Sequence, residues 1–362
     1  MDEKNSVPEK EFLQEGSLIL SSSPHIRTSM TTSRIMLQVL LCLLPVVAAS
    51  IWFYGWNALR VILLCMIFCV GMEYLWCKIA KTPHTCKDFS ALVTGLILAL
   101  NLSPLIPWWL CLIGAFIAII IAKEVFGGLG QNPFTPAAVA RVALLIGATK
   151  PMTTWAPLPS AFHHFDGVTS ATPLSAAAEF SAVTSATPTA AANTQLAIFN
   201  SNEFLWNAFL GNIGGCLGET STLAILIGAA GLVYLGIIRL YIPVAILATI
   251  TIFIWIVNGI SPGTTPGPMF HLLTGGVMIG AFFMATDYVT SPVTNLGKIV
   301  FGAGIGIIVC VIRIWGSYPE GMSFAIVIMN ALVPLIDKLC YKRPFGWNPP
   351  AGTFQPRRGE IK

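Results

Sequence analysis

Long apolar segments, separated by short polar stretches, run through most of the chain. A helix needs about 20 mostly apolar residues to cross a bilayer, and several of these segments approach that length. The candidate helices are residues 35–54, 58–77, 89–102, 107–122, 136–149, 221–238, 241–260, 270–287, 298–314 and 322–338. The pattern therefore predicts an all-α polytopic membrane protein with about ten transmembrane helices.

Glycine and proline are frequent between the predicted helices, and several of the helices are shorter than a full span. Residues 127–136, 261–268 and 316–321 are examples of such breaks. Irregular backbone is tolerated at membrane depth only where protein or a cavity satisfies its polar groups. We therefore expect broken or re-entrant elements around an internal site.

Two parts of the chain resemble each other weakly. Phe-Ser-Ala-Leu-Val-Thr-Gly at 89–95 and Phe-His-Leu-Leu-Thr-Gly at 270–275 are each followed by an apolar stretch and then Ser-Pro. Two halves of five helices would have opposite orientations, so the pattern predicts two inverted five-helix repeats with the functional site near their interface. Chance similarity between two apolar stretches is the alternative.

The predicted helices divide the chain into five parts. They are an N-terminal segment (1–34), a first five-helix repeat (35–150), a polar segment (151–220), a second five-helix repeat (221–338) and a C-terminal tail (339–362).

Composition supports a membrane protein. The chain has 362 residues, of which 55% are apolar and 10% charged, whereas about 25% of residues are charged in soluble domains. These values exclude a soluble enzyme, a secreted disulfide protein and a disordered chain. Most of the nine cysteines lie inside apolar runs without the spacing of metal ligands, so we interpret them as packing residues and expect no metal site.

Basic residues indicate the orientation. If both termini are cytoplasmic, seventeen of the 20 Lys and Arg residues lie on the inner side. The three outer ones are Arg60, Lys150 and Arg313. Because cytoplasmic loops are rich in Lys and Arg, we expect residues 151–220 to lie outside, in the periplasm or at the cell exterior.

The external segment repeats a hexapeptide. Val-Thr-Ser-Ala-Thr-Pro occurs at residues 168–173 and again at 183–188. Such Ser, Thr, Ala and Pro repetition is typical of a flexible linker. A Thr hydroxyl near an Asp is also chemically suited to accept a transferred group. The residues alone favour the linker.

Several longer motifs are more specific. They are Ser23–Arg27, Thr32–Met36, Lys87–Gly95, Lys123–Phe134, Gly211–Thr220, Ala285–Asp287 and Tyr318–Gly321. Together they resemble the NqrB/RnfD family, which holds membrane subunits of the Rnf complex and of the sodium-pumping NADH:quinone oxidoreductase. The resemblance implies a subunit of an ion-translocating ferredoxin:NAD oxidoreductase that is active only within its complex. It also implies a place in the plasma (inner) membrane of a bacterium or archaeon.

The resemblance also implies a covalent FMN. In the family, a flavin transferase attaches FMN through a phosphoester to a Thr in a motif similar to Asp-x-x-(Ser/Thr)-Gly-Ala-Thr. Asp166 to Thr172 fits this motif, except that Ser170 replaces the Gly, so Thr172 is the expected acceptor. Thr187 lacks the upstream Asp and is the alternative attachment site.

A second, non-covalent flavin (riboflavin or FMN) is implied in the membrane part. Asn132 could hydrogen-bond its ring edge, or could simply cap a helix break. The expected partners are the other Rnf subunits, of the C, G, E, A and B types, together with the flavin transferase and membrane lipid. No nucleic acid is expected.

Ionisable residues in or near the helices are the remaining candidates, because charges are costly at membrane depth and often functional. Asp287 and Glu73 are candidates for ion coupling, and Asp287 could instead serve as a structural hydrogen-bond hub. Glu124 beside Lys123 is interpreted as a surface pair. Residues 211–220 are either a re-entrant turn at the internal cavity or an ordinary helix N-terminus.

Two other functions compete with a redox subunit. Broken helices and an inverted repeat also occur in channels and transporters for small solutes, and a scaffold subunit would need no cofactor. The motif at 166–172 separates the redox hypothesis from both.

The charge asymmetry predicts the topology directly. Single cysteines at Ser181 and Thr353 should react with a membrane-impermeant maleimide from opposite sides of the membrane. Labelling of both positions from outside intact cells would contradict the topology.

Overall fold

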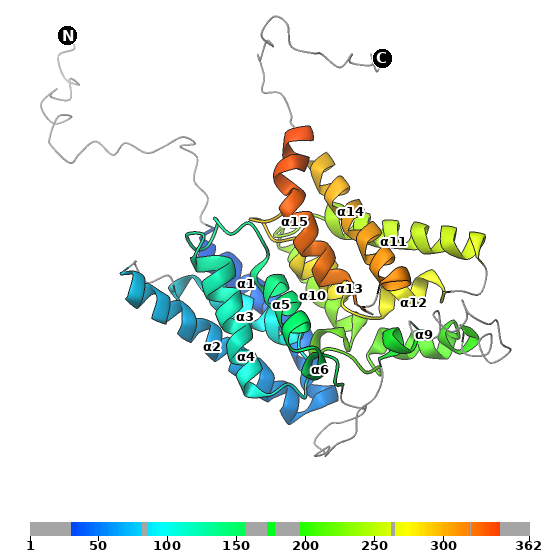
Figure 1. Cartoon of the computed structure of the whole chain (residues 1–362), viewed down its shortest axis with the longest axis horizontal. Helices are drawn as coiled ribbons and strands as arrows, with labels where there is room; N and C mark the ends of the chain where they lie inside the picture. The colour runs from blue at the N-terminus through cyan, green and yellow to red at the C-terminus, as the bar shows by residue number, and fades with distance from the viewer. Residues whose placement is uncertain are drawn as a thin grey trace, which may run out of the picture.

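Helices in two neighbouring groups form the structure (Figure 1). The computed structural model describes residues 30–81, 86–155, 172–177, 196–261, 265–316, 318 and 320–340. The first group contains α1 (Thr32–Tyr54), α2 (Trp56–Ala80), η1 (Cys86–Asp88), α3 (Ser90–Leu100), α4 (Trp108–Phe116), η2 (Ile117–Glu124), α5 (Pro136–Gly147) and α6 (Thr149–Met152). The second contains α9 (Asn202–Leu210), η3 (Leu217–Glu219), α10 (Thr222–Tyr234), α11 (Tyr241–Ile260), α12 (Pro268–Leu273), α13 (Val277–Ile279), η4 (Gly280–Met284), α14 (Asn295–Trp315) and α15 (Met322–Leu339).

The prediction of a polytopic all-α membrane protein is confirmed. Each of the ten predicted segments coincides with helical structure. Among the described residues, α1, α2, α11, α14 and α15 are long and apolar enough to cross a membrane. The helices α3, α5 and α10 are apolar but shorter.

Two of the predicted helices are irregular. The second half of 107–122 continues as the π-helix η2, which extends to Glu124. The segment 270–287 breaks after α12, because Thr274 is extended and Gly275 has φ of 72°, a left-handed conformation that favours glycine. The expected broken elements are therefore present.

Polar side chains begin several helices. Thr31, Ser221 and Thr294 accept a hydrogen bond from a backbone N–H in the first turn of α1, α10 and α14. Pro136 occupies the first turn of α5, where a missing N–H costs nothing. These short-range signals explain why the helices begin where they do.

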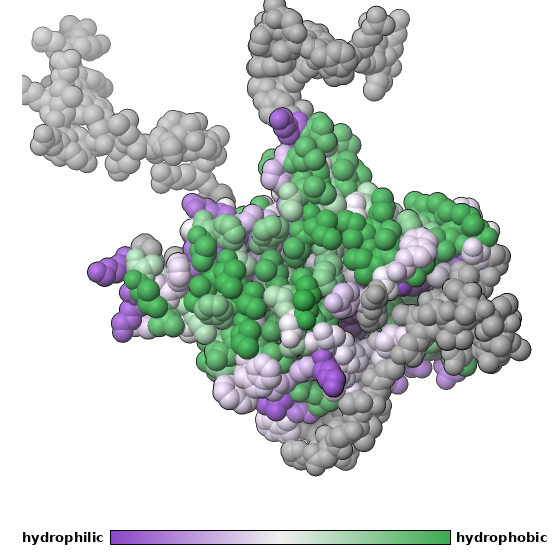
Figure 2. Space-filling model, viewed as in Figure 1, coloured by the Kyte–Doolittle hydropathy of each residue, from purple (hydrophilic) through white to green (hydrophobic). Residues whose placement is uncertain are grey.

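Small residues bring the helices into close contact. Gly95 of α3 faces the Cys65 carbonyl of α2, and Gly302 of α14 faces the Ile242 carbonyl of α11. Gly228 of α10 faces the Cys42 carbonyl of α1. Such packing is common in membranes, where apolar burial alone does not drive helix association. Large apolar side chains instead cover the surface, as Figure 2 shows.

The α1–α10 contact gives a stability prediction. A Cβ added at Gly228 would lie 2.2 Å from the Cys42 oxygen, so Gly228→Ala must push two helices apart. We expect a loss of about 1–3 kcal/mol, as for other overpacked sites, measured by thermal unfolding of the purified protein. Gly259→Ala is the matched control, since nothing lies within 4 Å of its Cβ position. Equal stability of the two variants would contradict this packing.

Candidate functional site

Thr172 begins a short helix over residues 173–177. Its Oγ1 accepts the Ser175 N–H over 3.1 Å, and the Ser175 hydroxyl donates to the Thr172 carbonyl over 2.9 Å. Thr172 is 7% exposed. The predicted acceptor is thus a helix cap. Asp166, Ser170 and Thr187 lie outside the described residues.

An aromatic cluster holds this helix in place. Leu174 and Ala177 pack against Phe270, together with Phe199 and Phe204. The Phe204 and Phe270 rings stack with centroids 5.7 Å apart. Because Phe270 belongs to α12, the helix that carries Thr172 is fixed to the broken segment of the second group.

Arg313 of α14 supports the break in that segment. Its Nη1 donates to the His271 carbonyl over 2.6 Å and its Nη2 to the Thr274 carbonyl over 3.0 Å. Arg313 is 6% exposed. Within the described chain, its Nε and both ring nitrogens of His271 have no hydrogen-bond partner. Buried polar atoms without partners are uncommon, and here they lie next to the segment that carries Thr172.

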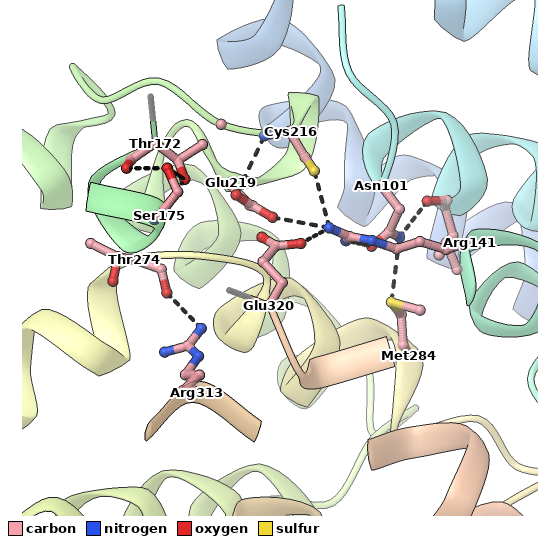
Figure 3. A network of polar contacts seen from close by, with 12 residues as sticks. Asn101, Arg141, Thr172, Ser175, Cys216, Glu219, Thr274, Met284, Arg313 and Glu320 are labelled. Atoms are coloured by element: carbon pink, nitrogen blue, oxygen red, sulfur yellow. Dashed lines mark hydrogen bonds and ion pairs between the residues drawn. The ribbon is translucent and has the colours of Figure 1, made fainter. Parts of the chain in front are cut away.

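A second buried arginine joins the two helix groups (Figure 3). Arg141 of α5 donates to the Asn101 Oδ1 over 2.6 Å and forms an ion pair with Glu320. Its Nη2 also lies 3.5 Å from Glu219 and 3.2 Å from the Cys216 sulfur. Burial raises the pKa of the Cys216 thiol, so its sulfur accepts this bond in the neutral form.

Three members of this network could ligate a metal by position. One ligand atom from each of Cys216, Glu219 and Glu320 lies within 4.8 Å of the others. The guanidinium of Arg141 already contacts all three residues. The positive charge at this place is therefore supplied by the protein itself.

A cavity of about 110 Å³ lies between the two groups. Its walls come from α1, α3, α5 and α10, from η2 and η4, and from the loops at 129–135, 237–238 and 286–289. Most of the lining is apolar, with a few polar side chains, as in binding sites for organic ligands. The polar members include Ser90, Thr94, Lys123, Asn132, Thr135 and Asp287. We call it the central cavity.

The sequence candidate Asn132 lines the central cavity. It is 4% exposed, and its Nδ2 donates to the Phe134 carbonyl over 3.0 Å. No described residue donates to its Oδ1. The side chain thus both stabilises a helix break and leaves an acceptor for another group.

The interpretation of Lys123 and Glu124 as a surface pair is wrong. Lys123 is 2% exposed and its Nζ lies 2.5 Å from the Glu73 Oε1 and 2.8 Å from the Ser90 hydroxyl. Glu124 is also buried, at 3.5 Å from the same Nζ. The ion pair of Lys123 with Glu73 makes a buried charge tolerable inside the first group.

Asp287 also lines the central cavity. Its Oδ2 accepts from the Thr290 hydroxyl over 3.2 Å, and Thr290 in turn lies 3.0 Å from the Thr135 hydroxyl. The Asn330 amide lies 3.0 Å from that same Thr135 oxygen. A chain of polar side chains therefore runs from Asp287 to α15.

Residues 211–220 form a largely buried loop that contains η3 and leads into α10. The Tyr54 hydroxyl donates to the Gly215 carbonyl over 2.9 Å, and the Leu217 N–H donates to the Leu102 carbonyl over 3.2 Å. Ser221 then caps α10. The loop contributes to the arginine network rather than to the lining of the central cavity.

Sequence reasoning missed the role of the buried arginines. The charge count places Arg141 on the inner side of the membrane and Arg313 on the outer side, yet both lie inside helices and are buried. Without Lys123 and these two residues, the expected asymmetry is fifteen against two. One signal in the sequence could have revealed these residues: each is a single charge within an apolar segment. Such a charge is costly in a membrane and is therefore usually paired inside the protein.

Several known proteins are similar to this chain over about nine-tenths of its length. The chain is 42% identical over 334 residues to a protein of Acetobacterium woodii named as the D component of a Na(+)-translocating ferredoxin:NAD(+) oxidoreductase complex, covering 92% of this chain and 97% of that one. It is 41% identical over 328 residues to the D component of a proton-translocating ferredoxin:NAD(+) oxidoreductase complex from Clostridium ljungdahlii, covering 90% and 96%.

A third relative comes from Escherichia coli and is named as the D component of an ion-translocating oxidoreductase complex. It is 38% identical over 344 residues, which cover 90% of this chain and 98% of the relative. The family match itself extends over residues 19–346 and so includes both helix groups. The chain therefore belongs to the NQR2, RnfD, RnfE family.

Proposed function

We propose that this chain is the flavin-carrying membrane subunit of an ion-translocating ferredoxin:NAD oxidoreductase complex of the Rnf type. It relays electrons through a covalent FMN on Thr172 and a second flavin in the central cavity, coupled to movement of Na⁺ or H⁺. The observation that carries the proposal is family membership over nearly the whole chain, together with a mostly apolar cavity that has a few polar side chains in its walls. Flavins accept and donate electrons when bound, and the protein holds and tunes them.

The surroundings of Thr172 support the covalent site. A relay needs each carrier at a fixed place, and the aromatic cluster fixes the helix that begins at Thr172. Its Oγ1 already makes local hydrogen bonds to Ser175, so a phosphoester at this oxygen requires the cap to rearrange. A flavin transferase would make that bond during maturation.

The polar lining of the central cavity supports the second flavin. A flavin ring is a flat, largely apolar body with hydrogen-bonding edges. The cavity offers apolar walls, and Asn132 has an oxygen without a partner among the described residues that could accept from the ring N–H. Lys123 and Ser90 are additional donors on the first-group wall.

Ion coupling is assigned to the acidic residues in and near the cavity. Asp287 lines it, and Glu73 contacts it indirectly through Lys123. A carboxylate next to a redox cofactor responds electrostatically to the charge that the cofactor gains or loses. In the assembled complex, subunits of the C, G, E, A and B types would supply the remaining carriers, in a bacterial or archaeal plasma membrane.

A solute channel or transporter is the second candidate. The broken segment at 274–276 and the cavity between two helix groups are features of that class as well. Flavin content separates the two functions, because a channel has no need of a covalent flavin.

The covalent site predicts a simple result in a denaturing gel. Wild-type protein should give a fluorescent flavin band, and Thr172→Val should abolish it because valine lacks the hydroxyl that forms the ester. Thr187→Val is the matched control and should keep the band. A band that persists in Thr172→Val and disappears in Thr187→Val would move the attachment site to Thr187.

Asp287 predicts a coupling defect. Asp287→Asn keeps the size and the hydrogen bond from Thr290 but removes the charge, so we expect at least about a tenfold loss of ion transport with normal assembly of the complex, equivalent to about 1.4 kcal/mol. Ion uptake into vesicles that contain the purified complex measures this. Glu203→Gln, at an exposed carboxylate of α9, should have no effect. Wild-type transport in Asp287→Asn would reduce Asp287 to a structural role.

A further inference from the structure

We propose that Arg313 provides the counter-charge for the phosphate group carried on Thr172 and so holds the helix at 173–177 against the loop at Gly275. This inference rests on the proposed flavin site and adds a residue that the sequence does not place near it. Arg313 and Thr172 are far apart along the chain, yet the fold brings their two segments together (Figure 3).

The first step concerns charge. Residues 151–238 contain no Lys or Arg, so a phosphoester on Thr172 finds no permanently charged cation in its own segment, whose only basic side chains are His163 and His164. A phosphate buried beside a helix cap without a cation would be costly. The balancing charge must come from another part of the fold.

The second step concerns proximity. The Leu174 Cδ2 atom lies 3.1 Å from the position that a Cβ of Gly275 would occupy, and the Arg313 Nη2 lies 2.6 Å from the same point. Leu174 is two residues after Thr172. Gly275 has φ of 72° and no side chain, and both properties allow the helix and the guanidinium to approach each other.

The third step concerns unused donors. A guanidinium has five N–H donors, and the carbonyls of His271 and Thr274 take two of those on Arg313. Arg313 forms no direct ion pair with any described carboxylate. Glu219, whose charge attracts Arg313 from farther away, and Glu320 both pair directly with Arg141. The Nε of Arg313 and both ring nitrogens of the buried His271 have no partner in the described ranges. Arginine with free donors suits a phosphate, which accepts two parallel hydrogen bonds.

The experiment separates this role from the structural bonds that Arg313 makes to two carbonyls. Wild type, Arg313→Gln, Thr172→Val and the double variant are purified as whole complexes. Hydrogen–deuterium exchange is then measured by mass spectrometry in peptides that cover 172–177 and 268–279. The in-gel flavin band is recorded for each variant.

The expected result is a coupling between the two positions. Arg313→Gln should speed the exchange of these peptides in both backgrounds, but by about tenfold more in the flavin-bearing protein than in the Thr172→Val protein. A tenfold difference is the effect expected from the loss of one charge-assisted hydrogen bond. The flavin band should remain in Arg313→Gln. Arg60→Gln is the control, because Arg60 also donates to a carbonyl, that of Ile106, and should show no coupling to Thr172.

Several outcomes would overturn the proposal. Equal effects of Arg313→Gln in both backgrounds would make Arg313 purely structural. Loss of the flavin band in Arg313→Gln would give the residue a role in attachment of the flavin rather than in holding the helix at 173–177. Absence of the flavin band from the wild-type complex would contradict the proposed flavin site itself. This result is seen before any variant is compared.

A milder variant decides the matter if Arg313→Gln does not assemble. Arg313→Lys keeps the charge but loses the paired donors, so it should still speed exchange more in the flavin-bearing protein than in the Thr172→Val background. Equal effects of Arg313→Lys in the two backgrounds would overturn the proposal.

Discussion

A backbone that leaves its helix inside a membrane must find hydrogen-bond partners within the protein, and this constraint organises the described structure. The break between α12 and α13 exposes the carbonyls of His271 and Thr274, and Arg313 binds both. The loop before η3 is held by Tyr54 and by the Leu102 carbonyl. Arg141 then joins the end of α3 to that loop through Asn101 and Glu219.

These arginines explain why short helices persist in the interior. Neither α12 nor α13 could cross a bilayer, and each would be unstable alone. A guanidinium offers five donors in a fixed plane, so one side chain can satisfy several acceptors that come from different elements. Breaking one partner of such a buried pair leaves a charge without compensation, which costs more than the pair contributes.

Most of the helices could be predicted from sequence because apolar length is a local property. The predicted segment 241–260 has the bounds that the structure shows, and 322–338 ends one residue early. The break inside 270–287 could not be placed, since Thr274 and Gly275 are compatible with a helix until Arg313 binds the carbonyls there. The burial of Lys123 depends on Glu73, 50 positions away, and a pattern of nearest neighbours cannot reveal such a partner.

Both helix groups contribute walls to the central cavity, so a ligand bound there affects how firmly the two groups are held together. A molecule that fills it contacts α1, α3 and α5 on one side and α10 and η4 on the other. Such a molecule binds only when the groups are docked, so its binding free energy is added to the work of separating them. An occupant would therefore stabilise the docked arrangement of the two helix groups. In cells that lack it, the two groups would separate more easily and the chain would be degraded more readily.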